Sequence, residues 1–464
     1  MFMDREAKKR RQTIRLIIRE FIMVVAIIAL VIVLTFVAMG YNLDKNGEVG
    51  QSGLLQIRSN PSGAIIEIDG EILSAKTNTS KMLTAGEHHV KLSKTGYDTW
   101  EKTILSESGW LLKLDYPRLF LTERVTDTVR DYSSDIQNFS VSPNHEFIVY
   151  SLASADDWTM LNVNNSNDIT ETSLAVSKIL EKNTVVDLKW NNNSDKILVQ
   201  TKKDNDTEWI IINVNNIDKS INLSRTFGMN FSDMEFASDN GEKLIAIENG
   251  NLRTVMASDR TISQIMASDV ECFSQNESKI IYLTRNHDVK LYQDGADDVT
   301  LASFGPEKTV RIALGEYLSR KYLVIIVDNN AYYYRGNLPT KDNSLDDMEL
   351  ALKKELKTTP DQLIKHSRDE LYIARSGKQL AVYDAEINKL SEYELESDDF
   401  YFLDDSLIAT ISEGKMIVRD FDGENRRDIT TASGAGFIAR DSKYLFYLKS
   451  DRGNSAIMRE KISD

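Results

Sequence analysis

The stretch FASDNGEKLIAIE, residues 236–248, holds the pattern that decides the fold. An aromatic residue comes first, the polar segment 238–241 follows it, and residues 244–247 form an uninterrupted apolar run. Ser, Asp, Asn and Gly favour tight turns, because their side chains or backbone freedom suit turn conformations. A short apolar run with little alternation is typical of a strand buried on both faces. The stretch therefore predicts a tight turn that leads into a buried β-strand.

The same pattern recurs along most of the chain. It starts eight times, with FSVSPNHEFIVYSL and KWNNNSDKILVQT as the first two examples, and successive starts lie 35 to 52 residues apart. A period of about 40 to 45 residues is that of a β-propeller, whose four-stranded blades bury one another's faces. The chain is thus predicted to be all-β, with a seven- or eight-bladed β-propeller over residues 118–464. The first residues of the eight segments are Phe139, Trp190, Phe236, Phe273, Ile312, Ile364, Phe402 and Phe437.

One late segment adds a family resemblance. In MIVRDFDGENRRDIT, residues 416–430, a strand runs into the turn Asp420-Phe421-Asp422-Gly423 and a second strand returns. This resembles the WD-repeat-like blades of the propeller in the Tol translocation system. Most other blades lack the Asp-x-Asp-Gly turn, so the resemblance over residues 119–464 is loose. It implies the propeller fold and says little about function.

A single membrane-spanning helix is predicted near the N-terminus. Residues 21–39 are uncharged and mostly apolar, long enough at about 1.5 Å per residue to cross a hydrocarbon core of about 30 Å. Residues 1–20 carry seven Lys or Arg against three Asp or Glu, and such a basic flank stays in the cytoplasm. We therefore expect a single-pass protein of the cell membrane, with residues 21–39 in the lipid bilayer, the N-terminus in the cytoplasm and the bulk of the chain outside it.

A cleaved signal peptide is the alternative, because Ala38 and Gly40 are small residues that suit a signal peptidase. The apolar run is, however, longer than the roughly 7–15 residues of such peptides. No Cys follows the run, which argues against lipid modification. Residues 40–53 are mostly polar and contain four Gly, and they predict a flexible linker before the first folded domain.

Residues 54–117 predict a small β-sandwich. Ala64, Ile66 and Ile68 alternate with acidic residues, which is the period of a half-buried strand, and Asp69-Gly70 suits a two-residue hairpin turn.

The segments NPSGAIIEIDG and LTAGEHHVKLSKTGYDTW resemble a PEGA domain. Pro61, Gly63 and Ala64 stand in the tetrapeptide that names this family, and Ser62 replaces its Glu. The resemblance implies a module of exported prokaryotic surface proteins that serves adhesion or spacing, and not an enzyme.

Charge limits the partners of the chain. Its net charge is −15, and because the first twenty residues carry +4, the rest carries −19. An acidic ectodomain repels nucleic acid, so none is expected as a partner. The single cysteine, Cys272, has no partner for a disulfide, and burial must hold the exported domains together.

Residues 344–357 interrupt the strand pattern and predict an inserted helix. Ser344 and Asp347 form a capping box, and a helical apolar face follows until Pro360. This face consists of Leu345, Met348, Leu352 and Leu356. The helix is expected to pack on the outside of its blade, or alternatively to cover one mouth of the propeller.

Tyr332, Tyr333 and Tyr334 are the candidate binding surface, because three successive aromatic rings could stack on a sugar or a peptide. Strand alternation is expected to bury at least one of them. The five His residues are scattered over two domains, so neither a metal site nor a cofactor is predicted. No catalytic residue is assigned either, since no Gly-x-Ser-x-Gly elbow or phosphate-binding Gly loop occurs.

These observations predict a membrane-anchored, non-catalytic binding or scaffold protein outside the cytoplasm. Its propeller would recognise a protein, a peptide or an envelope glycan, since propellers bind ligands where loops converge at the channel mouth. Two alternatives stay open. One is an exported hydrolase or lyase, which perturbed acidic residues at the channel mouth would favour. The other is an architectural spacer of the cell envelope.

Overall fold

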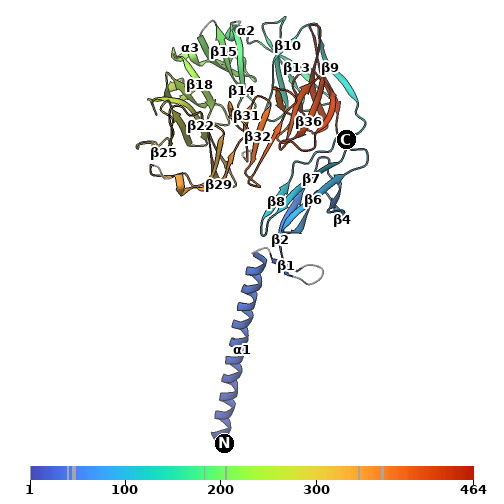
Figure 1. Cartoon of the computed structure of the whole chain (residues 1–464), viewed down its shortest axis with the longest axis vertical. Helices are drawn as coiled ribbons and strands as arrows, with labels where there is room; N and C mark the ends of the chain where they lie inside the picture. The colour runs from blue at the N-terminus through green and yellow to red at the C-terminus, as the bar shows by residue number, and fades with distance from the viewer. Residues whose placement is uncertain are drawn as a thin grey trace. The chain divides into compact units, whose positions relative to one another are not determined.

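The computed structural model describes residues 2–38, 41–43, 49–181, 183–203, 206–342, 345–366 and 370–464. The chain divides into two compact units, Met1–Thr122 and Glu123–Asp464. The first contains a long helix and a β-sandwich, and the second is a β-propeller (Figure 1).

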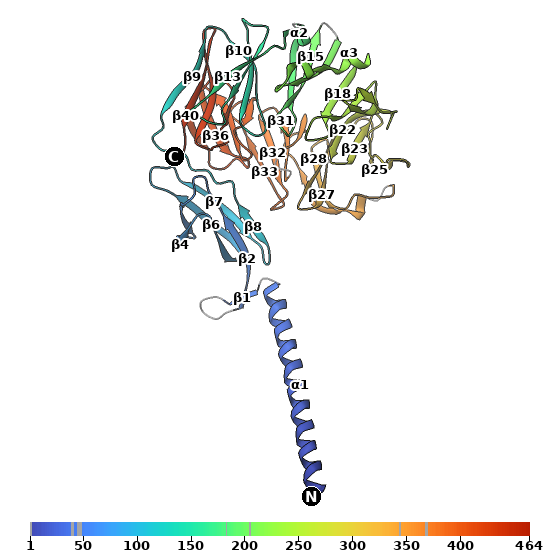
Figure 2. The ribbon, with the colours of Figure 1, turned by 180° about the vertical axis from the view of Figure 1, so that it is seen from behind.

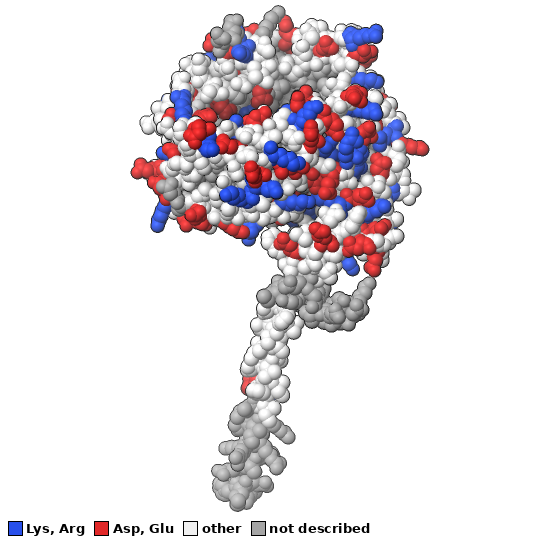
Figure 3. All heavy atoms as spheres, viewed as in Figure 1, with Lys and Arg blue, Asp and Glu red and all other residues white. Residues whose placement is uncertain are grey.

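Helix α1 extends over Phe2–Ala38 and contains residues 21–38 of the predicted membrane span. Its stretch Ile18–Phe36 has a mean hydropathy of 2.6, and none of it is buried in the protein. The described side chains of this stretch are almost entirely uncharged in Figure 3. Thr35 donates its hydroxyl to the Val31 carbonyl at 2.8 Å, so even this polar group needs no water. The helix is long and apolar enough to cross a membrane; Met39 lies outside the described residues.

The predicted flexible linker over residues 40–53 is wrong for the part that the structure describes. Tyr41–Leu43 form β1, which pairs antiparallel with the start of β2, Val49–Ile57. Pairing of two strands needs only backbone hydrogen bonds. A segment without an alternating apolar pattern can therefore still form a strand. Gly53 has a packing role: a Cβ there would lie 2.5 Å from the Glu107 carbonyl oxygen. The segment 44–48 lies outside the described residues.

Two four-stranded sheets form the sandwich of the first unit. One pairs β2 with β1, β5 and β8, and the other has the order β4-β3-β6-β7. The Asp69-Gly70 turn between β3 and β4 has positive φ at both residues, as predicted for a two-residue hairpin. The remaining strands are β3 (Ile65–Ile68), β4 (Glu71–Lys76), β5 (Thr79–Thr84), β6 (Gly86–Ser93), β7 (Trp100–Ser106) and β8 (Leu111–Leu114).

The sandwich core uses the alternate residues of both sheets. Leu55 and Ile57 of β2 face Ile66 of β3 and Val90 of β6, and all four are buried. Trp100 of β7 is fully buried and meets Tyr116 edge to face, with ring centroids 6.1 Å apart. Burial of such large apolar side chains lets a domain of this size fold without a disulfide.

The second unit contains eight four-stranded antiparallel sheets among its described residues, so the propeller has eight blades. Figures 1 and 2 show these sheets arranged radially. Blades 1 and 2 consist of β10 (Ile136–Val141), β11 (Phe147–Leu152), β12 (Trp158–Asn162), β13 (Thr170–Leu174), then β14 (Thr184–Trp190), β15 (Lys196–Lys203), β16 (Asp206–Asn213) and β17 (Ile221–Asn222). Blades 3 and 4 consist of β18 (Phe231–Phe236), β19 (Lys243–Glu248), β20 (Asn251–Met256), β21 (Thr261–Ile262), then β22 (Val270–Asn276), β23 (Lys279–Thr284), β24 (Asp288–Leu291) and β25 (Val299–Ser303).

Blades 5 and 6 consist of β26 (Val310–Tyr317), β27 (Arg320–Val327), β28 (Asn330–Gly336), β29 (Glu349–Glu355), then β30 (Gln362–Lys365), β31 (Leu371–Ser376), β32 (Gln379–Asp384) and β33 (Lys389–Glu394). Blades 7 and 8 consist of β34 (Phe400–Phe402), β35 (Leu407–Ser412), β36 (Lys415–Asp420), β37 (Arg427–Thr431), then β38 (Gly436–Ile438), β39 (Tyr444–Asp451), β40 (Asn454–Lys461) and β9 (Thr126–Tyr132). Short helices α2 (Ser177–Leu180) and α3 (Leu223–Phe227) and 3-10 turns at Ile217–Lys219 and Leu345–Asp347 connect strands.

The second strand of each blade carries the apolar run that the repeat predicted. In β19 the four central residues of KLIAIE are buried, and β11 shows the same pattern in FIVYSL. Blades then pack face to face through these residues, as where Trp209 of blade 2 is buried among residues of blade 3. The indole of Trp209 donates to the Phe231 carbonyl at 2.9 Å, which also satisfies its polar atom.

The ring closes by pairing the two ends of the unit. β9 lies at the start of the second unit, yet it is the outermost strand of blade 8. It pairs antiparallel with β40, which lies at the end of the unit (Figure 2). Glu460 of β40 is buried and forms an ion pair with Arg124, just before β9, with Nε and Oε1 2.7 Å apart. Arg124 also donates from Nη2 to the Ile429 carbonyl of blade 7 at 2.9 Å. Backbone pairing and a buried charge pair thus secure the same seam.

The inserted helix predicted for residues 344–357 is wrong. Glu349–Glu355 form β29, the outermost strand of blade 5, and Leu345–Asp347 form only one 3-10 turn. The edge of β28 offers unpaired backbone groups, and a short isolated helix cannot compete with that ladder. Leu352 still packs inward, against Tyr333 of its register partner strand. Ser344, the predicted cap, lies outside the described residues.

Candidate binding site in the propeller channel

The first strand of each blade lines the propeller channel. Successive first strands contact one another, as β22 contacts β26 and β26 contacts β30. In blades 1 to 4 the pairing of this strand with its neighbour shifts by one residue, for example between Val185 and Asp187 and between Phe231 and Asp233. Such bulges redirect side chains. Four consecutive blades therefore carry the same irregularity where the channel wall is built.

Equivalent carboxylates follow two of these bulges. Asp187 of β14 accepts the Leu188 backbone N–H at Oδ1, and Asp233 of β18 accepts the Met234 N–H in the same way, both at 2.8 Å. These bonds hold each carboxylate against its own strand. The repeat of the fold thus repeats a fixed negative charge in neighbouring blades.

Lys189 of β14 lies among three carboxylates. Its Nζ is 4.0 Å from Asp187, 3.9 Å from Asp233 and 3.9 Å from Glu235. The ammonium also lies 5.9 Å from the centre of the Trp209 ring. One cation therefore lies between acids of two blades, and among the described residues no cation lies closer than 3.9 Å to any of the three carboxylates.

Glu235 of β18 has a raised pKa. Burial raises its pKa above the ordinary value, the charge of Asp233 adds to the rise, and Lys189 and Lys365 oppose it. Yet 41% of its side chain is exposed. Protein surrounds the carboxylate while water still reaches it, as expected for a group that faces a narrow channel.

Lys365 brings a third blade to the site. Lys365 is the last residue of β30 in blade 6. Its Nζ donates to the Gln275 carbonyl of blade 4 at 3.1 Å, so the side chain reaches past blade 5. Gly315 of blade 5 makes room, since a Cβ there would lie 3.3 Å from Lys365 Cδ and would overlap Tyr372. We name Asp187, Lys189, Asp233, Glu235 and Lys365 the channel cluster.

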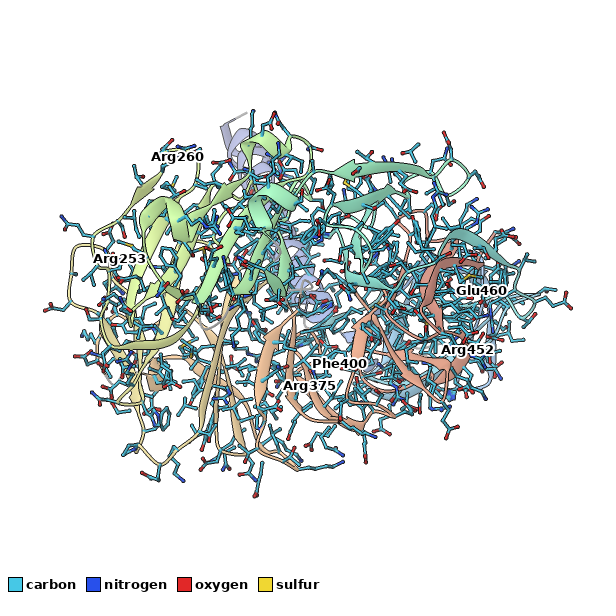
Figure 4. The ribbon with its side chains drawn as sticks, turned by 90° about the horizontal axis from the view of Figure 1, so that it is seen from above. Arg253, Arg260, Arg375, Phe400, Arg452 and Glu460 are labelled. Carbon is cyan, nitrogen blue, oxygen red and sulfur yellow. The ribbon has the colours of Figure 1, made fainter. Side chains whose placement is uncertain are left out.

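An aromatic and cationic pair joins the second strand of blade 6 to the first strand of blade 7. The Arg375 guanidinium lies 5.3 Å from the centre of the Phe400 ring, and Figure 4 shows the two residues side by side. Arg375 also donates from Nε to the Gly377 carbonyl at 3.2 Å. Phe400 begins the first strand of blade 7 and stays partly exposed. On the face shown in Figure 3, by contrast, acidic and basic side chains are interspersed over the propeller surface.

The three predicted tyrosines lie on β28, the third strand of blade 5, and not on a channel strand. Tyr333 is fully buried and stacks on Tyr383 with centroids 3.9 Å apart, which is the burial that alternation predicted. Tyr332 and Tyr334 stack on each other at 6.5 Å, and Lys353 lies over the Tyr332 ring. Ligand binding by Tyr332 and Tyr334 stays a prediction.

Among the described residues, no group of three or more His, Cys, Asp or Glu side chains is placed to hold a metal ion. His145 and His287 instead bond backbone carbonyls of Ile438 and Gly305 at 2.7 and 3.0 Å. Burial raises the pKa of the Cys272 thiol to about 12, so it is a poor nucleophile near neutral pH.

Sequence reasoning missed the channel cluster although a signal was present. Asp187-Leu188-Lys189-Trp190 and Asp233-Met234-Glu235-Phe236 share one pattern, in which two charged residues alternate just before the aromatic residue that starts a repeat. Charged residues at equivalent positions of neighbouring inner strands come close to one another near the propeller axis. No such sequence pattern accompanies Lys365, because only the fold brings this residue of blade 6 close to Glu235 of blade 3.

Comparison with known proteins identifies a family for part of the first unit. The family model of the PEGA domain matches residues 52–117. This segment is a PEGA domain. No curated protein matches the chain in sequence. Similar solved structures include the WD40 domain of SCAP from fission yeast, with 10% identity, a TM-score of 0.43 and coverage of 74% of this chain and 98% of that one.

Two further solved structures are similar to the chain. The Cps50 (Swd1) β-propeller domain of Myceliophteria thermophila has 9% identity, a TM-score of 0.39 and coverage of 60% and 96%. An oligogalacturonate lyase in complex with manganese has 9% identity, a TM-score of 0.41 and coverage of 72% and 98%. These values carry no functional argument, and the propeller fold rests on the sheet topology described above.

Substitution of Glu235 by Gln should change the pH dependence of stability. A raised pKa means that the folded protein holds this proton more tightly than the unfolded chain does, so stability falls as pH rises above about 4.5. We expect Glu235→Gln to weaken this pH dependence and to raise the melting temperature at pH 8. The increase should be only about 1–2 °C, because water screens the carboxylate. Thermal unfolding from pH 5 to 8 measures this effect.

Glu349→Gln is the control, because Arg335 lowers the pKa of Glu349 and its loss should not stabilise the protein. An unchanged pH profile in Glu235→Gln would contradict the assignment of Glu235.

Proposed function

We propose that the protein is held in the cell membrane by α1 and binds a protein or peptide segment outside the cytoplasm through the channel cluster. The observation that carries this proposal is that Lys189 lies 3.9 to 4.0 Å from acids of two blades, and that Lys365 of a third blade acts on Glu235, whose side chain is 41% exposed. The acids outnumber the two lysines, and among the described residues no cation lies closer than 3.9 Å to the Glu235 carboxylate. A basic side chain of a ligand would supply such a cation and so lower the free energy of the site.

The PEGA domain supports the location of this activity. Such domains are found mostly in exported surface proteins, and here the domain begins at residue 52, after the apolar helix ends at Ala38. A spacer of this kind would separate a binding propeller from the lipid surface. The acidic ectodomain also favours basic partners over nucleic acid or free anionic lipid.

The test is co-purification of the full-length protein from its own membranes. Wild type should retain a partner in stoichiometric amount, and the variant Asp233→Asn, Glu235→Gln should retain at least about tenfold less, because paired charges are lost. The matched control is Glu349→Gln, Glu355→Gln, which removes two acids from the outer strand β29. Equal retention by all three proteins would contradict the channel as binding site, and absence of any partner would favour an architectural spacer.

A hydrolase or lyase is the second candidate, and the raised pKa of Glu235 beside Asp233 is the observation that favours it. In such an enzyme Glu235 would act as general acid. Glu235→Gln would then lower turnover of an envelope glycan by at least about a hundredfold while binding persists. In the binding protein, the same substitution weakens binding and no turnover is measured.

A further inference from the structure

The outer face of one sheet of the PEGA domain carries an exposed apolar row. Leu54 of β2 lies opposite Met82 of β5 on one side and Leu111 of β8 on the other. These three side chains are 38%, 40% and 47% exposed, whereas their neighbours Leu55 and Leu83 point into the core. Trp110, which precedes Leu111, is 49% exposed. Three adjacent strands thus present apolar side chains to the outside.

The charge of this sheet differs from that of the chain as a whole. Strands β5 and β8 and the stretch 52–57 of β2 contain no Asp or Glu, although the chain has 71 of them. Lys113 continues the exposed face beside Gln56, and Lys81 is exposed on β5. Apolar side chains, a Trp and lysines without acids form the composition that suits the interface between lipid headgroups and acyl chains.

The chain keeps this face near the bilayer. Ala38 ends α1, Tyr41 begins β1, and Tyr41 pairs with Gln51, which is three residues before Leu54. These steps limit the distance from the helix end to Leu54 to roughly 25 Å. A domain on so short a tether samples the headgroup surface at high effective concentration, so even weak contacts would be populated.

We propose that the face formed by Leu54, Met82, Trp110 and Leu111 lies on the anionic headgroup surface of the membrane that α1 crosses. The apolar row would enter the interface and Lys81 and Lys113 would contact phosphate groups. This docking requires the anchor but not the channel cluster, so it is independent of what the propeller binds. Its consequence is a fixed orientation of the PEGA domain on the membrane.

The test places a fluorescent label on the full-length protein in vesicles. Leu54→Cys is labelled in a Cys272→Ser background, and Leu105→Cys is the matched control, since Leu105 is 58% exposed on the opposite sheet. In vesicles of phosphatidylcholine and phosphatidylglycerol, spin-labelled lipid should quench the label at residue 54 at least about twofold more than at residue 105. The difference should shrink in phosphatidylcholine alone and after Leu111→Asp.

Flotation of the vesicles first shows whether the protein is anchored. A failure of the anchor is thereby distinguished from a failure of the PEGA domain to dock. Equal lipid quenching at both positions would overturn the proposal. Protection of residue 54 from both lipid and aqueous iodide would also overturn it: if that protection depends on protein density, a second copy covers the face, and if it does not, another part of the same chain does.

Discussion

Removal of residues 2–38 is expected to release the protein from the membrane completely. The twelve Leu, Ile, Val and Phe residues between Phe21 and Phe36 favour insertion by roughly 0.3–0.6 kcal/mol each, or about 4–7 kcal/mol together. The rest of the chain has its own buried cores, so the shortened protein should fold and stay in solution. Alkaline extraction of membranes followed by centrifugation measures this: full length in the pellet, the shortened protein in the supernatant.

The side of the membrane is tested on the same cells. A protease that cannot cross the membrane should digest the C-terminal bulk of the full-length protein in whole cells, because the basic N-terminal flank is expected inside. Digestion only after lysis would place the propeller in the cytoplasm. A full-length protein that is already soluble would instead show that the helix is removed or does not insert.

The second large effect is expected at the seam of the propeller. Arg124→Ala leaves the buried carboxylate of Glu460 without its cation, and loss of one partner of a buried ion pair costs about 3–5 kcal/mol. The lost bond to the Ile429 carbonyl adds to this. We expect the free energy of unfolding of the propeller to fall by about that amount in urea titrations followed by tryptophan fluorescence. The seam should also become more sensitive to protease.

The double variant Arg124→Ala, Glu460→Gln separates charge from packing. Without the carboxylate the unpaired charge is gone, so the double variant should be more stable than Arg124→Ala. Lys461→Ala is the exposed control: its pair with Asp464 is largely in solvent, and its loss should change stability by less than about 1 kcal/mol. A loss of less than about 1 kcal/mol in the free energy of unfolding of Arg124→Ala would mean that the ion pair does not stabilise the seam.

Local pattern was enough to predict the propeller because each blade repeats the same local chemistry. The apolar run of β19 and the turn before it are readable in residues 236–248, and the structure confirms both. The eight repeat starts predict seven or eight blades, and the structure has eight, with the last one completed by β9, which lies more than 300 residues before β40. Such closure is a long-range pairing that no local window contains.

The errors have a common physical cause, which is tertiary competition for a short segment. Leu345, Met348, Leu352 and Leu356 fit a helical face, yet the free edge of β28 recruits residues 349–355 as a strand. Likewise the Gly-rich segment after α1 pairs where a linker was expected. In both places the partner strand, and not the local sequence, decides the conformation.

The candidate site was predictable only in part. The charged pairs of β14 and β18 stand at equivalent repeat positions and could have been aligned from the sequence. Their meeting with Lys365 depends on the absent side chain of Gly315 and on the ring closing around the channel. Three successive tyrosines predict a stacking surface, but the sequence does not show that their strand is the third of its blade.

Photo-crosslinking in intact membranes tests the central claim most directly. A photoreactive amino acid at Val186, which is 57% exposed on the inner strand of blade 2, should give one discrete adduct with a partner. The same group at Leu350, 46% exposed on the outer strand of blade 5, should give none. Adducts from Leu350 and not from Val186 would contradict binding through the channel.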